Sequence, residues 1–160
     1  APRSSAERCG ARSCPTTGGS SSSTEPSAEP STYDPTMAGT SDRYFAALDE
    51  LVDTSRVVID RPAGTAHPRV PQAIYPLDYG YLDGTTGGDG DGIDVFVGVE
   101  EGLGVVGVLL TADVAKRDVE VKVLLDCSAL EIVAARAFVS EVLEIGGVLV
   151  RRPPEREQAG

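Results

Sequence analysis

Hydrophobic and polar residues alternate in short runs along much of the chain. Three valines alternate with Glu120 and Lys122 between positions 119 and 125, which predicts a strand with one apolar and one charged face. Four further runs have the length and the apolar or β-branched composition of strands: 56–60, 94–99, 104–110 and 148–150. The pattern therefore predicts five short strands.

Two segments show helical periodicity instead. Apolar residues recur every three or four positions over 42–52, where Ser41 is a predicted N-cap. A second amphipathic helix is predicted over 130–143, and Gly146-Gly147 is expected to end it. Five strands with a late helix predict an α+β, mainly β fold: a small five-stranded, OB-like antiparallel barrel with peripheral helices.

Composition changes sharply near position 40. Residues 1–40 are rich in Ser, Gly and Pro and poor in aliphatic residues. Such a segment buries too little apolar surface to offset its ordering entropy, so a disordered tail is predicted there. Met37, the only methionine, is expected to be the initiator. One folded domain is predicted over 41–154, followed by a disordered C-terminus at 155–160.

Charge and cysteine content exclude several classes of function. The net charge is −11, and such a surface repels nucleic acid and anionic membranes, so neither is an expected partner. Cys127 is the only cysteine of the predicted domain, which rules out a disulfide there and fits a reducing cytosol. With a single histidine in the chain, a zinc site of Cys and His ligands is not expected either.

Three carboxylates, Asp89, Asp91 and Asp94, lie within six residues and are spaced by glycines. Two unit charges about 4 Å apart repel by roughly 4 kcal/mol at an effective dielectric of 20, so such a cluster calls for a cation. Hard divalent cations take carboxylate oxygens as ligands. In an extended chain Asp94 points away from the other two, and a turn at Gly92 would bring all three together.

A second acidic pair, Asp113 and Asp118, flanks a polar connection between two predicted strands. The spacing suits opposite shoulders of a hairpin with Lys116 and Arg117 at its tip, and Lys122 follows on the next strand. Carboxylates near Lys, Arg and Tyr side chains are what Mg²⁺-dependent phosphoryl chemistry uses, because metal-bound water needs a base and phosphate oxygens need cations.

Calcium sites and a plain surface turn are the alternative interpretations of the acidic cluster. An EF-hand loop starting at Asp89 fails at Ile93 and Asp94, where that motif requires an oxygen ligand and a glycine. A calcium-binding β-helix repeat is matched by residues 87–90, but once only, and such folds need several copies. An acidic, glycine-rich surface turn without a ligand remains open.

Two motifs resemble the soluble family I inorganic pyrophosphatases. The signature of that family, Asp-x-Asp-x-x-Asp followed by an apolar residue, is matched by residues 89–95. Its Tyr-Pro-x-x-Tyr-Gly-Tyr block is matched just upstream by residues 75–81. Asp113 and Asp118 align without a gap to the later metal-binding stretch of the family. The resemblance covers roughly residues 56–126.

The resemblance implies a role for each aligned residue. Four carboxylates would bind Mg²⁺, with Mn²⁺ as the alternative metal: Asp89, Asp94, Asp113 and Asp118. Asp91 would be the general base that takes a proton from metal-bound water. Tyr79 would hydrogen-bond near a phosphate, and Tyr75 would support the pocket.

The cationic side departs from the family pattern. The segment that carries the phosphate-binding lysine and arginine residues of the family is shortened here, and Glu120 stands where the family has a lysine. Lys122 is the expected substitute. The predicted substrate-binding residues are Tyr75, Tyr79, His67, Arg69 and Lys122. A loop histidine without a role and core tyrosines with satisfied hydroxyls remain the alternatives.

These residues predict an inorganic diphosphatase: Mg²⁺-dependent hydrolysis of pyrophosphate to two phosphates by direct attack of metal-activated water. The alternatives are a hydrolase of another phosphoanhydride or nucleotide, and a non-catalytic relative that binds metal and phosphate. A small-molecule phosphate is the expected partner, assembly into a homo-oligomer is compatible with it, and a cytoplasmic location is expected.

Overall fold

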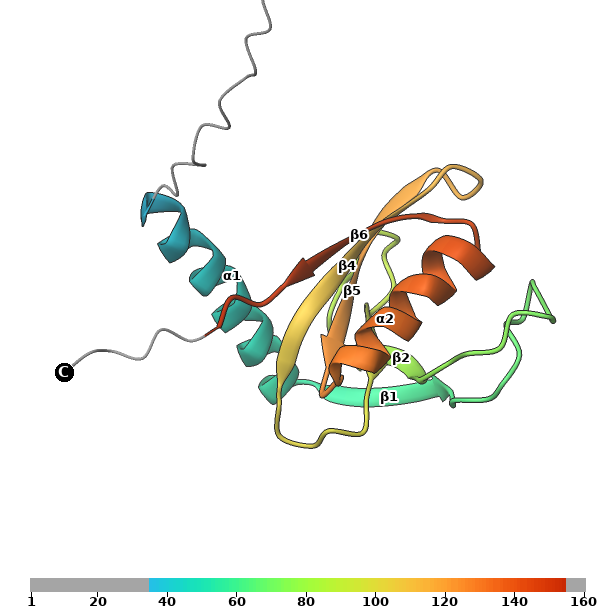
Figure 1. Cartoon of the computed structure of the whole chain (residues 1–160), viewed down its shortest axis with the longest axis horizontal. Coiled ribbons are helices and arrows are strands. Elements are labelled where there is room, and N and C mark those ends of the chain that lie inside the picture. Colours follow the sequence, from blue (N-terminus) through green and yellow to red (C-terminus); the bar gives the residue numbers. More distant parts are fainter. Residues whose placement is uncertain (1–34, 155–160) are drawn as a thin grey trace, which may run out of the picture. The chain divides into compact units, whose positions relative to one another are not determined.

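The computed structural model describes residues 35–154, with side chains from residue 41 onward. The elements follow in chain order (Figure 1): α1 (Pro35–Thr54), β1 (Arg56–Arg61), β2 (Asp78–Asp83), β3 (Ile93–Val97), β4 (Val105–Asp113), β5 (Asp118–Leu125), α2 (Ala129–Ala137), the π-helical turn η1 (Phe138–Val142) and β6 (Gly146–Arg151). None of the helices in this part of the chain combines the length and apolarity that a membrane crossing needs.

The strands form one sheet in the order β1-β2-β3-β5-β4-β6. Neighbouring strands are antiparallel except β3 and β5, which are parallel. The predicted α+β, mainly β fold is confirmed, with two differences in detail. The sheet has six strands because β2, which was not predicted, joins it, and the β3–β5 pair breaks the expected antiparallel pattern.

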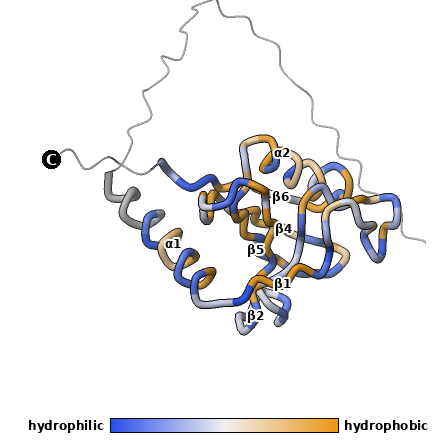
Figure 2. The backbone as a smooth tube through the Cα atoms, turned by 90° about the horizontal axis from the view of Figure 1, so that it is seen from below, coloured by the Kyte–Doolittle hydropathy of each residue, from blue (hydrophilic) through white to orange (hydrophobic). Residues whose placement is uncertain are grey.

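The sheet buries hydrophobic residues on both faces, because adjacent residues of its central strands point to opposite sides. In β5, Val123 joins the cluster that α1 covers with Phe45 and Leu48, whereas Leu124 joins the cluster under α2. Figure 2 shows the concentration of hydrophobic residues along β4 and β5. The two helices are therefore peripheral, as predicted, and each closes one core.

The helices differ from their predicted bounds. α1 runs through Ser41, which is therefore not an N-cap, and begins before position 41, so the last six residues of the predicted tail are helical. The rest of that tail and the predicted C-terminal tail lie outside the described residues. α2 begins after Ser128, and η1 ends at Val142, so that three residues separate it from the glycine pair that opens β6.

Gly80 explains why β1 and β2 lie so close together. A Cβ atom at this position would overlap the backbone carbonyl of Val58 on β1. Only glycine fits there without moving a strand. The close approach sets the position of β2, which carries Tyr79 and Tyr81 on either side of this glycine. The Tyr-Gly-Tyr sequence therefore has a structural reason apart from any chemistry.

Candidate functional site

A buried lysine lies at the centre of the candidate site. Parallel pairing of β3 and β5 places Asp94 in register with Lys122. The Lys122 ammonium donates to Asp94 Oδ2 at 2.5 Å, to Glu120 Oε2 at 2.5 Å and to the Tyr79 hydroxyl oxygen at 3.1 Å. Both Lys122 and Glu120 are only 7% exposed. The charged face of β5 is thus buried, because its side chains pair with each other and with β3.

These contacts fix the charge states. Burial alone lowers the pKa of Lys122, but the nearby Asp94 and Glu120 carboxylates outweigh it and raise this pKa above its usual value. Burial acts to raise the pKa of Glu120. The hydrogen bonds and positive charges of Lys122 and Lys116 outweigh burial and lower this pKa below its usual value. For Asp94, burial outweighs the attraction of Lys122, so that pKa is raised. Lys122 is therefore an ammonium that binds ionised Glu120.

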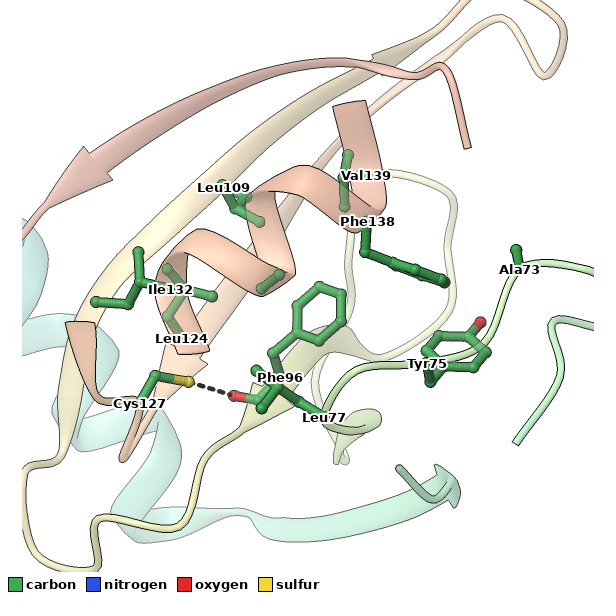
Figure 3. Close-up of a cluster of buried hydrophobic side chains, with 11 residues drawn as sticks. Ala73, Tyr75, Leu77, Phe96, Leu109, Leu124, Cys127, Ile132, Phe138 and Val139 are labelled. Atoms are coloured by element: carbon green, nitrogen blue, oxygen red, sulfur yellow. Dashed lines mark hydrogen bonds between the residues drawn. The ribbon is translucent and has the colours of Figure 1, made fainter. Parts of the chain in front are cut away.

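Aromatic rings form a continuous row beside this charged centre. The centroids of His67 and Tyr75 are 5.8 Å apart, those of Tyr75 and Tyr79 5.2 Å, and those of Tyr79 and Phe96 4.7 Å. Phe138 packs against this row, with its ring centroid 4.8 Å from that of Tyr75 (Figure 3). Burial, followed by the charge of Asp94, raises the pKa of Tyr79, so its hydroxyl stays protonated. Both tyrosines are therefore packed in the core and also face the site.

A pocket of about 650 Å³ opens beside the row. Six of the predicted site residues line it: His67, Arg69, Tyr75, Tyr79, Asp113 and Lys122. Glu120 and Lys116 line it as well, although neither was a predicted site residue. The sequence held a signal for this ion pair, because the two residues are four positions apart across a predicted hairpin. Lys116 Nζ lies 3.2 Å from Glu120 Oε1.

The loop before β2 brings His67 to the pocket. His67 N donates to Ala73 O at 2.8 Å, and its Nδ1 accepts from the backbone amides of Arg69 and Val70, both at 3.2 Å. Burial lowers the pKa of this imidazole, and the positive charges of Lys116 and two arginines add to the effect. The neutral ring thus presents its other nitrogen as a donor.

Asp89 and Asp91 lie in an exposed turn outside the pocket lining. Asp89 Oδ1 accepts from the Asp91 amide at 3.0 Å, and Gly87 N donates to Asp91 O at 2.5 Å. The positive φ of 93° falls on Gly90, so the expected turn forms there rather than at Gly92. Within the described residues, these two carboxylates and Asp94 do not gather into one ion site.

Asp113 and Asp118 pair directly across the β4–β5 hairpin. Asp113 Oδ1 accepts from the amides of Ala115 at 2.8 Å and Lys116 at 3.1 Å. Arg117 takes a left-handed conformation with φ of 62° at the tip. The predicted hairpin with its acidic shoulders is therefore confirmed, and Asp113 also stabilises its turn.

The predicted metal ligands do not form a metal site in this arrangement. Among residues 35–154, no three Asp, Glu, His or Cys side chains are placed to share an ion. Lys122 already binds Asp94, while backbone amides bind Asp89 and Asp113. As placed, the residues do not fit a bound divalent ion, so no chemical step is assigned to one. A metal role for these carboxylates, and for Asp118, stays a prediction.

No family model matches the chain. An inorganic pyrophosphatase from Leifsonia xyli subsp. xyli (strain CTCB07) is 39% identical over 77 residues, which is 43% of this chain and 44% of that protein. The chain therefore spans less than half the length of this curated relative. This sequence similarity confirms the predicted resemblance to the inorganic pyrophosphatases.

Two solved structures are similar to the chain. An inorganic pyrophosphatase from Coxiella burnetii has a TM-score of 0.45 at 19% identity, covering 59% of this chain and 82% of that one. A protein from Anaplasma phagocytophilum, described as an inorganic phosphatase, has a TM-score of 0.44 at 21% identity, covering 59% and 81%.

Proposed function

We propose that the protein hydrolyses inorganic pyrophosphate to two phosphates. The observation that supports this most is the pocket, in which Arg69, Lys116 and Lys122 surround space lined by two tyrosines. Cations of this kind bind phosphate oxygens and stabilise the charge that develops on them during phosphoryl transfer. The similarity to an inorganic pyrophosphatase over 77 residues supports the same reaction.

Each predicted side chain receives a role within this proposal. Lys122 and Arg69 neutralise phosphate oxygens, and His67 donates a hydrogen bond to one of them. Tyr79 hydrogen-bonds near a phosphate through its hydroxyl at the edge of the pocket, and Tyr75 positions Tyr79 by stacking against it at 5.2 Å. Asp91, exposed in a turn outside the pocket lining, remains the proposed general base on the strength of the aspartate motif alone.

Mg²⁺, with Mn²⁺ as the alternative, is the proposed cofactor on the strength of the aspartate motif alone. The sequence predicts four ligands, Asp89, Asp94, Asp113 and Asp118, and Asp94 is the one whose carboxylate already binds the Lys122 ammonium. Their carboxylate oxygens suit a hard divalent ion, although their present arrangement does not gather them. A cytoplasmic location, a homo-oligomeric state and the absence of nucleic-acid or membrane partners likewise remain predictions.

Phosphate release tests the proposal. Purified full-length protein is incubated with pyrophosphate and Mg²⁺, with Mn²⁺, or with a chelator, and we expect release in the metal arms only. Asp91→Asn should lower turnover by about 10²–10⁴-fold, because a positioned base contributes that much. Asp83→Asn is the matched control, since Asp83 lies on β2 and pairs with Arg56 at 3.1 Å, away from the pocket. Absence of phosphate release in every arm would overturn the proposal.

The apolar wall of the pocket favours a second candidate, a nucleotide or another organic phosphoanhydride. Val70, Phe138 and Leu143 line the same pocket as the cations, and about 650 Å³ is within the usual range for organic ligands. Assays with nucleoside triphosphates and diphosphates beside pyrophosphate discriminate the two. A higher kcat/KM for a nucleotide would replace pyrophosphate as the proposed substrate.

The ion pairs of Lys122 favour a third candidate, a non-catalytic relative. Glu120, which lines the pocket, and Asp94 are already engaged by this lysine rather than free to act on a substrate. Such a protein would bind pyrophosphate without cleaving it. Calorimetry that shows binding, combined with no phosphate release, would identify this function.

A further inference from the structure

We propose that Lys122 is a built-in cation that takes the place of one divalent metal ion at Asp94. That the pocket binds pyrophosphate rests on the proposed function. The replacement of a metal ion by Lys122 concerns only which cation the Asp94 and Glu120 carboxylates bind. It follows from the contacts of Lys122, the charge balance around it and its place in the sheet.

The Lys122 ammonium has a full set of hydrogen-bond acceptors within the protein. The Lys122 ammonium has three N–H donors, and three acceptors surround it: Asp94 Oδ2 at 2.5 Å, Glu120 Oε2 at 2.5 Å and the Tyr79 hydroxyl at 3.1 Å. All donors are therefore used within the protein. The side chains of Lys122 and Glu120 are each 9% exposed, and that of Asp94 is 25% exposed. A divalent ion would have to displace the ammonium to reach these oxygens.

The charges of the side chains that contact one another around Lys122 offset each other. Asp94 and Glu120 supply two negative charges, and Lys122 supplies one positive charge between them. Lys116 supplies a second positive charge from the hairpin tip, 3.2 Å from the other oxygen of Glu120. The four groups together are neutral. Asp118, which interacts with Glu120, adds one negative charge at the edge of this group. A divalent ion at Asp94 would still be repelled by the buried Lys122 ammonium.

The pairing of the strands sets the position of Lys122. Lys122 is opposite Asp94 because β3 and β5 pair in parallel register, so the sheet itself sets the contact. The ammonium lies over the Tyr79 ring, with Nζ 5.6 Å from the ring centroid. The ammonium also lines the pocket. The built-in cation is therefore fixed by the backbone at the wall of the pocket.

Mn²⁺ binding to the full chain tests this without any assay of activity. Electron paramagnetic resonance measures free Mn²⁺ during titration of the unaltered protein, Asp94→Asn, Lys122→Met and the double variant. We expect Asp94→Asn to leave Mn²⁺ binding unchanged. Lys122→Met should bind one more Mn²⁺ ion per chain than the unaltered protein, and the double variant should lose this additional site.

Lys116→Met is the matched control. It removes a positive charge that contacts Glu120 but does not touch Asp94, so it should gain no such site. A weaker Mn²⁺ affinity in Asp94→Asn would overturn the proposal, because Asp94 would then be a metal ligand already. A folded Lys122→Met protein that gains no Mn²⁺ would overturn it too.

A second measurement covers the case in which Lys122→Met does not fold. Mn²⁺ is titrated into the unaltered protein, and paramagnetic broadening of the amide resonances is followed by NMR. Resonances of Asp94 and Lys122 should persist at Mn²⁺ concentrations that broaden more exposed acidic segments. Broadening that begins at these two residues would contradict the proposal. Neither result depends on phosphate release, so failure of the proposed function leaves this test standing.

Discussion

At the scale of single residues, Lys122 shows how a buried charge is retained. Its ammonium is 7% exposed and bonded to two carboxylates and a phenol. Removing one partner of such a pair costs about 3–5 kcal/mol, because the other charge is left buried and unpaired. The same contacts that stabilise the fold therefore also maintain a positive charge at the pocket.

His67 offers a direct test of the electrostatics of the pocket. It is the only histidine in the chain, so its imidazole NMR resonances are unambiguous. Burial and then the charges of Lys116, Arg61 and Arg69 lower its pKa, so its titration midpoint should fall below about 6.5, the model-peptide value. Between the lowered pKa and 6.5 the unfolded chain binds more protons, so this residue reduces stability as pH falls through that window. A midpoint at or above about 6.5 would contradict the described environment.

The residue contacts of the site were only partly predictable. Alternation placed Glu120 and Lys122 on one face of a strand, which the structure confirms. Their burial was not predictable, because the partner Asp94 is 28 residues from Lys122 in the sequence. The turn at Gly90 was placed two residues late, since every glycine in that segment permits a positive φ.

At the scale of elements, α2 depends on a capping box. Ser128 Oγ accepts from Glu131 N at 3.3 Å, and Glu131 Oε2 accepts from Ser128 N at 2.8 Å. Glu131 Oε1 also accepts from Val99 N at 3.2 Å, which ties the helix start to the end of β3. The cap therefore positions α2 over the sheet as well as starting it.

Ser128→Ala should lower the free energy of unfolding by about 1 kcal/mol, because one N-cap bond is lost. Urea unfolding followed by circular dichroism measures this. Ser140→Ala is the control, since Ser140 Oγ only donates to the Arg136 carbonyl at 2.9 Å within the helix. Its effect should stay within about 0.5 kcal/mol. Equal losses in both variants would show that the capping box contributes nothing.

Most strands were predictable, and β2 was not. β4 and β5 are long apolar or alternating runs, and they appear within a few residues of their predicted bounds. β2 combines Asp, Gly and Tyr residues with only Leu82 as an aliphatic residue, so it lacks the pattern of a strand. It forms a strand because Gly80 lets it approach β1, a long-range contact that local sequence does not encode.

At the scale of the whole described domain, one sheet supports two cores. α2 covers one and α1 the other, and Arg152 joins α1 to the segment after β6 through Asp49 at 2.7 and 2.8 Å. The early helix was predicted from its periodicity, but its role as the cover of a separate core was not. That role depends on the side-chain alternation of strands distant from it.

Phe45→Ala should destabilise the protein by about 3–5 kcal/mol, because a ring that is 2% exposed is removed from the core under α1. Tyr44→Ala is the adjacent control, since Tyr44 is 41% exposed. Its loss should be below about 1 kcal/mol. Thermal and urea unfolding measure both variants. Similar losses would show that α1 does not cover a core.

The parallel pairing of β3 and β5 also bears on the order in which parts of the chain fold. β2–β3 and β4–β5 are antiparallel pairs of sequence neighbours, and local hairpins form in about 1–10 μs. Asp94 and Lys122 belong to different hairpins, so their contact must wait until the two hairpins dock. Closing such long-range contacts is the slow part of folding. We therefore expect the charged centre of the pocket to form only after the two hairpins dock.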